Sequence, residues 1–192
     1  MTDATVSLPP GYREIPDRMN IAAELIDRIE ERGFGDRAAF IWDDGELSFA
    51  KFAVRVNKLA HGFTSNGIEK GMPVLIRMNN CHEFAEAVLA LLKVGALPVL
   101  QNSLLGQEEV EYVLDHSDAR AAVTLGGLAE PLVTLSAKLP AGIFAARGAP
   151  EGTTAFESLI DTAPDGPFVT ADTDANEPAF FVYTSGTTGR PK

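Results

Sequence analysis

Apolar positions along the chain follow two periods, one typical of amphipathic helices and one typical of buried strands. Residues 20–32 begin with a good N-cap, Asn20, and their apolar side chains share one helical face: Ile21, Leu25, Ile26 and Ile29. The same period predicts a longer helix over 49–64, whose inward residues are Phe52, Val56, Leu59, Ala60 and Phe63. This helix should end beside Asn66 and Gly67, which tolerate the left-handed conformation.

Between these two helices, residues 39–42 and 46–49 form short apolar runs. They flank an Asp-Asp-Gly turn at 43–45. A glycine-containing acidic turn between two such runs predicts a β-hairpin.

After the second helix, strand and helix patterns alternate. Residues 74–78 read as a buried strand, and Asn80 with Glu83 has capping-box spacing before a helix that ends at Gly95. Further elements are predicted as a strand at 98–101, a helix at 107–116, a strand at 120–125, a helix at 128–138, and short elements at 142–146, 156–160 and 179–183. The strands lack a polar face, so the fold class is α/β, a mainly parallel sheet with helices on both faces.

The organisation along the chain is simple. Residues 1–18 read as an N-terminal arm and 19–192 as one domain, with loops at 140–154 and 163–178 that are rich in proline, glycine, alanine and threonine. The first twenty residues lack the apolar core of a secretory signal. The most apolar stretch, 84–100, is interrupted by charged residues, glycine and proline, so no membrane span is predicted.

The composition of the chain limits the kinds of partner that it can bind. The 192 residues are 45% apolar and 22% charged, enough to bury a core, and the formal charge of -11 makes nucleic acid and anionic membranes poor partners. Cys81 is the only cysteine, which rules out an intrachain disulfide and favours a reducing compartment, the cytoplasm.

Residues 179–183 form a buried-strand pattern that runs directly into a small, polar loop at 184–192. Glycines let backbone N–H groups approach phosphate oxygens, hydroxyls add donors without bulk, and Lys192 supplies a compact positive charge. A Walker-type loop does not fit, because Pro191 stands where that motif requires glycine. A plain glycine, serine and threonine linker is the simpler alternative for so short a run.

The complete string at 183–192, Tyr-Thr-Ser-Gly-Thr-Thr-Gly-Arg-Pro-Lys, resembles the signature of the adenylate-forming superfamily, which includes acyl- and aryl-CoA synthetases, luciferases and peptide-synthetase adenylation domains. Residues 47–52 and 92–99 are similar to two further segments of that family, and the resemblance spans about 20–192. Segments 20–37 and 102–119 look most like the benzoate- and aminobenzoate-CoA ligase branch.

The resemblance implies an AMP-forming acid–thiol ligase that uses ATP, Mg²⁺ and CoA. A carboxylate, with an aromatic acid favoured over a medium-chain or alicyclic one, would form an acyl-adenylate and pyrophosphate, and CoA would then displace AMP. The residues implied in binding the β- and γ-phosphates are Thr184, Ser185, Gly186, Thr187, Thr188 and Lys192, with Gly189 allowing the turn.

In that family the catalytic residues, the metal ligands, the rest of the N-terminal domain and a mobile C-terminal domain would lie beyond Lys192. The 192 residues alone are therefore expected not to complete adenylation, and faces that normally meet later segments should be exposed and favour self-association into homo-oligomers. The alternatives are an adenylation domain that loads a carrier protein and a standalone, non-catalytic interaction domain. A reading frame that continues past Lys192 would favour the ligase, and a native mass near 20.5 kDa the standalone domain.

Other reactive side chains have simpler interpretations. His61, His82 and His116 have no metal-binding spacing and are assigned surface or core roles. Cys81 has no nearby base and is expected to be an inert, half-buried thiol. The acidic run at 108–111 complements the start of a predicted helix.

Overall fold

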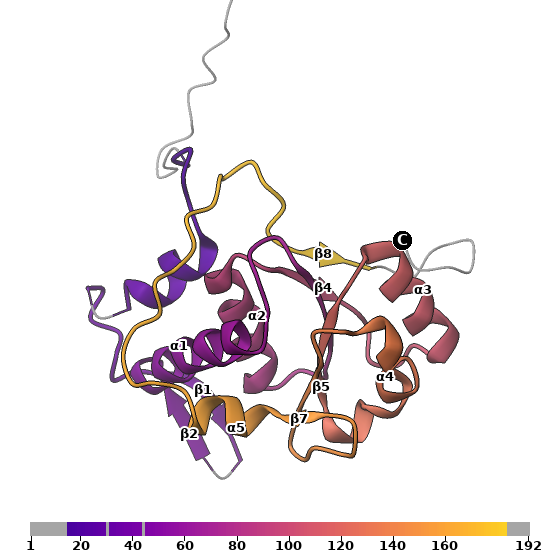
Figure 1. The fold of residues 1–192 in the computed structure, drawn as a ribbon. Helices are drawn as coiled ribbons and strands as arrows, with labels where there is room; N and C mark the ends of the chain where they lie inside the picture. Colours follow the sequence, from indigo (N-terminus) through magenta and orange to yellow (C-terminus); the bar gives the residue numbers. More distant parts are fainter. Residues whose placement is uncertain (1–14, 30, 44, 184–192) are drawn as a thin grey trace, which may run out of the picture.

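The computed structural model describes residues 15–29, 31–43 and 45–183 of the chain. Its centre is a six-stranded sheet in the order β7-β6-β5-β3-β4-β8, in which every neighbouring pair is parallel (Figure 1). The strands are β3 (Pro73–Arg77), β4 (Leu97–Leu100), β5 (Ala121–Leu125), β6 (Ile143–Ala146), β7 (Thr154–Ala155) and β8 (Phe181–Val182). The predicted α/β class with a parallel sheet is confirmed.

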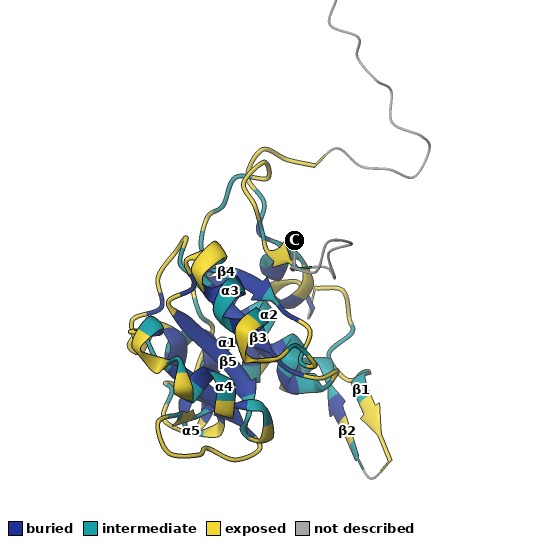
Figure 2. Ribbon diagram, turned by 90° about the vertical axis from the view of Figure 1, so that its right-hand side faces the viewer, coloured by how far each residue is buried: buried dark blue, intermediate teal, exposed yellow. Residues whose placement is uncertain are grey.

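Helices cover both faces of this sheet, as the apolar strands predicted. On one face lie α1 (Phe49–Ser65), α2 (His82–Val94) and α5 (Phe156–Asp161), and on the other α3 (Gln107–Ser117) and α4 (Glu130–Thr134) (Figure 1). Strand residues alternate between the two cores: Val74 and Ile76 of β3 pack with α1 and α2, while Leu75 packs with α3 and α4. Figure 2 shows the central strands buried between these layers.

Helix α1 forms as its pattern predicted. The hydroxyl of Ser48 accepts a hydrogen bond from the backbone N–H of Lys51 at 3.3 Å, which satisfies one of the free donors of the first turn. All five residues predicted to face inward are buried. The helix ends at Ser65 with Asn66 as its C-cap, and Gly67 adopts the left-handed conformation with φ +83°.

The predicted hairpin is also present, with β1 (Ala38–Trp42) antiparallel to β2 (Gly45–Ser48). It projects from the body of the domain (Figure 2). Phe49, expected at the end of the second strand, instead begins α1, because Ser48 already serves as the N-cap of that helix.

The first predicted helix is shorter and more irregular than expected. Asn20 accepts a hydrogen bond from the N–H of Ala22 at 2.9 Å, but the chain then forms a π-helical turn, η1 (Ala23–Asp27), and does not continue as a helix to Arg32. A π-helical turn changes the angle between successive side chains. Leu25, predicted to face inward, is therefore 51% exposed.

The predicted capping box before α2 is wrong. The helix begins at His82, one residue later than that motif requires, and its N-cap is Cys81, whose side chain makes no capping bond. The Glu83 carboxylate forms its ion pair with Arg147, far along the chain. The predicted end is confirmed, since Gly95 closes the helix in the left-handed conformation with φ +79°.

The single helix predicted over 128–138 is broken into three short pieces: η2 (Gly126–Leu128), α4 (Glu130–Thr134) and η3 (Ser136–Lys138). Pro131 explains part of this break. Proline has no N–H and fits only the first turn of a helix, so a helix can begin at Glu130 but cannot run through Pro131 from an earlier turn.

The segment 163–180, here called the strap, was predicted to be mostly loop. It crosses the α1/α2 side of the domain and leads from α5 into β8 (Figure 1). The buried amide of Asn20 donates to the carbonyls of Leu92 and Ala171, at 2.8 and 3.1 Å. The strap has no regular structure of its own but is fixed along its length by the body of the domain.

Charged side chains hold the strap as well. Lys93 is fully buried and pairs with Asp27, whose second oxygen accepts a hydrogen bond from the hydroxyl of Thr170 at 2.5 Å. Farther along, Arg18 forms an ion pair with Asp172 at 2.5 Å.

None of the helices in the described ranges has both the length and the apolar character needed to cross a bilayer.

Candidate functional site

The carboxyl edge of the sheet contains the point where the chain changes its winding direction. From β3 the chain goes through α2 to β4 on one side, and from β5 it goes through α4 to β6 on the other. Open parallel sheets bind ligands outside the carboxyl ends of the strands at such a point. This edge is therefore the candidate site.

Strand β8 ends at the same edge, directly before the predicted phosphate loop in the sequence. Phe181 and Val182 pair with Val99 and Leu100 of β4, and the N–H of Tyr183 donates to the carbonyl of Leu100 at 3.2 Å. The predicted loop residues, Thr184, Ser185, Gly186, Thr187, Thr188, Gly189 and Lys192, lie outside the described residues. The structure thus gives the origin of the loop.

The prediction that the strand at 179–183 is buried is wrong. Only Phe181 and Val182 form β8, and their side chains are 38% and 54% exposed. Within the described chain β8 pairs only with β4, so its outer edge has no neighbouring strand to cover it.

Tyr183 is held by α3 on its other side. Its hydroxyl lies 2.6 Å from Nδ1 of His116, and the two rings meet edge to face at 5.7 Å. Tyr112 stacks on the same imidazole at 5.6 Å. Burial raises the pKa of Tyr183, and Tyr112 raises it further, so the phenol is neutral near pH 7. His116, assigned only a surface or core role from the sequence, therefore lies at the start of the loop.

Three polar side chains lie at or next to the carboxyl ends of the neighbouring strands. Thr124 of β5 lies beside Arg77 of β3, and its hydroxyl donates to the Arg77 carbonyl at 2.9 Å. Arg77 is 5% exposed, and Gln101, directly after β4, is 6% exposed. Burial lowers the pKa of Arg77. The sequence reading missed these residues, although a cation at the end of an apolar strand was a visible signal.

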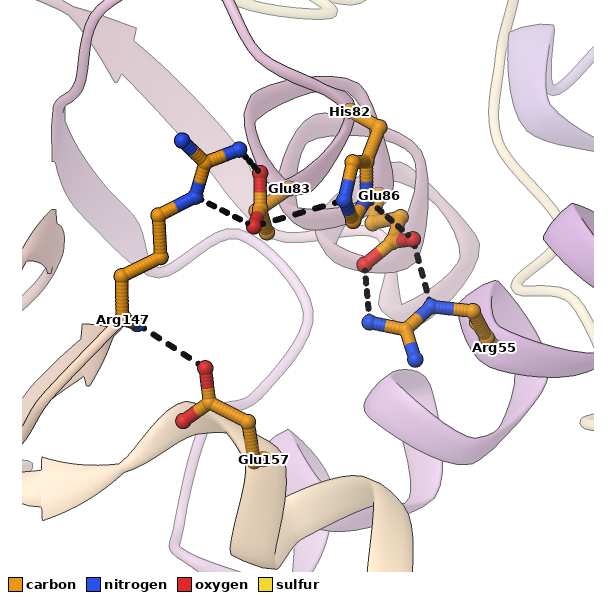
Figure 3. A network of polar contacts seen from close by, with 6 residues as sticks. All are labelled: Arg55, His82, Glu83, Glu86, Arg147 and Glu157. Atoms are coloured by element: carbon orange, nitrogen blue, oxygen red, sulfur yellow. Dashed lines mark hydrogen bonds and ion pairs between the residues drawn. The ribbon is translucent and has the colours of Figure 1, made fainter. Parts of the chain in front are cut away.

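A second polar network surrounds the start of α2 (Figure 3). Arg55 of α1 binds both oxygens of the fully buried Glu86, at 2.6 and 3.0 Å. Nδ1 of His82 lies 3.0 Å from the same carboxylate, and Nε2 lies 3.4 Å from an oxygen of Glu83. The imidazole also stacks on Trp42 of the hairpin at 5.3 Å.

The same network extends to the end of β6. Arg147 donates two hydrogen bonds to Glu83, at 2.7 and 3.0 Å, and its backbone N–H donates to Glu157 of α5 at 2.9 Å (Figure 3). Burial by itself would raise the pKa of Glu83, but the bonds from Arg147, together with hydrogen bonds from the backbone N–H of Glu83 and from the Cys81 thiol, outweigh it and the pKa is lowered. Glu83 and Glu86 are both paired with arginines, so the network joins four elements and leaves neither carboxylate available as a base.

Cys81 lies beside this network, in the wall of a cavity of about 500 Å³ under the hairpin. Burial raises the pKa of its thiol to about 11. A thiol with this pKa is almost fully protonated at neutral pH, which agrees with the inert role predicted for Cys81.

Two further features bear on ligand binding. A mainly apolar cavity of about 710 Å³ lies between the strap and the amino ends of β3 and β4, next to Gly71 and Leu97, and so away from the carboxyl edge.

Across residues 15–29, 31–43 and 45–183, no three His, Cys, Asp or Glu side chains come together to hold a metal ion. None of these residues is assigned as a ligand of Mg²⁺.

Comparison with known proteins identifies relatives over nearly the whole chain. The family described as AMP-binding enzyme matches residues 28–192. A benzoate–CoA ligase of Thauera aromatica is 32% identical over 187 residues, which are 96% of this chain and 35% of the relative. A 3-hydroxybenzoate–CoA ligase of Aromatoleum sp. (strain CIB) is 29% identical and covers 91% of this chain and 34% of its own length.

Solved structures agree with this result. A benzoate CoA ligase from Burkholderia xenovorans LB400 superposes with a TM-score of 0.75 at 28% identity, over 86% of this chain and 32% of that one. An anthranilate CoA ligase in complex with anthranoyl-AMP gives a TM-score of 0.84 over 93% of this chain and 34% of that one, at 24% identity, and so supports the fold alone. The chain thus spans about a third of the length of these relatives.

Proposed function

We propose that this chain, which belongs to the AMP-binding enzyme family, is the phosphate-binding part of an AMP-forming carboxylate–CoA ligase. One observation carries the proposal. The loop with the family's signature starts at Tyr183, and Tyr183 lies at the carboxyl edge of a doubly wound parallel sheet, where such sheets bind nucleotides.

The proposed reaction has two steps. A carboxylate oxygen attacks the α-phosphorus of ATP, the bond from that phosphorus to the bridging oxygen breaks, and pyrophosphate leaves. The thiol of CoA then attacks the carbonyl carbon of the acyl-adenylate and releases AMP, giving the thioester. Mg²⁺ would offset charge on the triphosphate, with ligands outside the described residues.

The loop would act in the first step. The backbone N–H group of Gly186 and the hydroxyls of Thr184, Ser185, Thr187 and Thr188 would hold the β- and γ-phosphates, Lys192 would offset their charge, and Gly189 would allow the turn. Because these groups fix the leaving pyrophosphate in line with the attacking oxygen, they lower the entropic part of the barrier.

We infer an aromatic carboxylate as the substrate. The relatives with the names benzoate–CoA ligase and 3-hydroxybenzoate–CoA ligase support this inference. A panel of benzoate, 2-aminobenzoate, octanoate and cyclohexanecarboxylate tests it, with kcat/KM expected to be highest for one of the two aromatic acids. A higher value for octanoate or cyclohexanecarboxylate would reject the aromatic assignment.

ATP and CoA as substrates, and the single free cysteine, fit a cytoplasmic enzyme.

The test of the activity is carboxylate-dependent exchange between ATP and radiolabelled pyrophosphate by the full gene product. Replacement of Lys192 by Met should lower the exchange rate by about 10²- to 10³-fold, because it removes the ammonium group that is proposed to offset the phosphate charge. The matched control is Lys51→Met, at an exposed lysine of α1. No exchange with any acid would favour the non-catalytic interaction domain, and transfer to a phosphopantetheinyl carrier in preference to CoA would favour the carrier-loading alternative.

A further inference from the structure

Four polar residues form a continuous row across the carboxyl edge, here called the edge row: Thr124, Arg77, Gln101 and Tyr183. Arg77 is directly paired with Thr124 in the β3–β5 ladder. Ile76 pairs with Leu100, so the next position brings Gln101 beside Arg77, and the N–H of Gln101 donates to the Ile76 carbonyl at 3.1 Å. The β4–β8 ladder places Tyr183 beside Gln101 in the same way.

The members of the row share the face of the sheet that α3 covers. Strand side chains alternate between faces, and the residues two positions earlier, Ala122, Leu75 and Val99, all belong to the core under α3 and α4. Tyr183 packs against the same core. The four side chains therefore lie next to one another on one face of the sheet. They extend from β5 and β3, between which the chain changes its winding direction, to Tyr183, where the loop begins.

Two members of the row are buried without enough partners. The guanidinium of Arg77 has five N–H donors, yet the described chain offers it one contact, from Nη1 to the Asn102 carbonyl at 3.4 Å, and Nε has none. Among the described residues, neither amide atom of Gln101 has a hydrogen-bond partner. A buried cation without a carboxylate is costly unless something anionic meets it.

We propose that Arg77 and Gln101 bind a phosphoryl oxygen of the nucleotide or of pyrophosphate, as a second phosphate-binding group in addition to the one proposed for the loop. The inference rests on the proposed function, since it extends the same site. Guanidinium and amide N–H groups match phosphate oxygens in geometry, and the guanidinium also matches them in charge. The row points to phosphate because its last member, Tyr183, is the residue from which the loop begins.

The experiment measures ATP–pyrophosphate exchange by the full gene product carrying Arg77→Met, Arg77→Lys or Gln101→Leu. Arg77→Met should raise KM for ATP and for pyrophosphate by about 10- to 100-fold, the range of a lost hydrogen bond to a charged group. KM for the carboxylate should stay within about twofold, since the acid makes no contact with this group. Arg77→Lys should recover part of the loss because it restores the charge without the planar fork.

Arg120→Met is the matched control, because Arg120 is an exposed arginine just before the amino end of β5 and should leave every KM unchanged. If Arg77→Met does not fold, Gln101→Leu and the thermal stabilisation of Arg77→Lys by pyrophosphate take its place. Stabilisation by pyrophosphate should be smaller for Arg77→Lys than for the unsubstituted enzyme.

Three results would decide against the inference or its premise. Unchanged KM values for ATP and pyrophosphate, with only a lower Tm, would make Arg77 a structural residue and overturn the inference. A rise confined to KM of the carboxylate would move the site to the acid and overturn the phosphate assignment. Absence of exchange by the unsubstituted enzyme would instead overturn the proposed function.

Discussion

At the scale of single residues, the side chains that define the edge of the sheet are held by partners that are distant in sequence. His116 and Tyr183 are 67 positions apart and share one hydrogen bond of 2.6 Å. Asn20 reaches a strap carbonyl 151 positions away. Such contacts fix the position at which a loop begins, although neither partner carries a motif that announces the contact.

The hydrogen bond between His116 and Tyr183 should affect the binding of ATP more than the binding of the carboxylate. His116→Phe and Tyr183→Phe each keep a ring but remove the hydrogen bond, so each should raise KM for ATP by about two- to tenfold in the proposed enzyme. The double variant should be no worse than either single one, because both remove the same bond. His61→Phe, at a histidine that packs on Phe168, is the control. Additive losses in the double variant would contradict a shared role.

Glu83 should make the free energy of unfolding depend on pH in the acidic range. Its folded pKa is lowered, so its contribution to the free energy of unfolding is present above its ordinary pKa and is lost as pH falls through the folded value. Glu83→Gln should therefore cost about 1–3 kcal/mol at pH 7, and the difference from the unsubstituted chain should shrink below about pH 4. Urea unfolding at both pH values measures it. Glu108→Gln, at an exposed acid of α3, should show no such trend, and a constant difference for Glu83→Gln would contradict the ion-pair explanation.

At the scale of elements, the packing of α1 on α5 depends on one glycine. A Cβ at Gly62 would lie 2.7 Å from Cβ of Leu159 and 3.0 Å from its carbonyl oxygen. Real Cβ atoms do not approach backbone this closely, so the two helices must separate if the side chain is larger. Glycine in mid-helix is thus explained by close contact between elements.

Gly62→Ala tests this contact, because two effects compete. Alanine favours the helix by about 1 kcal/mol, while overpacking of a tight contact costs about 1–3 kcal/mol. The clash involves backbone and should win, so the free energy of unfolding in urea should fall. Gly127→Ala has open space around the new methyl group and serves as the control. A more stable Gly62→Ala chain would show that α5 moves freely.

At the scale of the whole molecule, the described surface leaves β8 as an open edge. Val182 is 54% exposed and Phe180 45%, beside backbone groups that no further described strand pairs. Exposed edges with apolar side chains promote association between chains.

The 192-residue chain should therefore self-associate through β8. Val182→Lys places a charge on the edge and should lower the association measured by sedimentation velocity at increasing concentration. Val169→Lys adds the same charge at a valine that is 90% exposed on the strap, away from β8, and should leave association unchanged. A chain that is monomeric at every concentration, or equal effects of the two variants, would contradict this surface as the cause.

The sequence by itself determined the periodic elements and the family. Helix α1, the hairpin, the central strands and the left-handed end of α2 at Gly95 follow from local patterns, because hydrophobic period, N-caps and glycine conformation act over a few residues. The string at 183–192 indicated the family for the same reason: its residues are contiguous.

Only the tertiary structure decided which residues meet at the edge of the sheet. The pairing of Glu83 with Arg147, 64 positions away, replaces a local capping preference by a distant contact. The edge row requires four strands to align in register, and strand order depends on the path of the whole chain. Burial of Arg77 without a full set of partners is a property of that assembly, because no local pattern sets how many donors a guanidinium leaves unpaired.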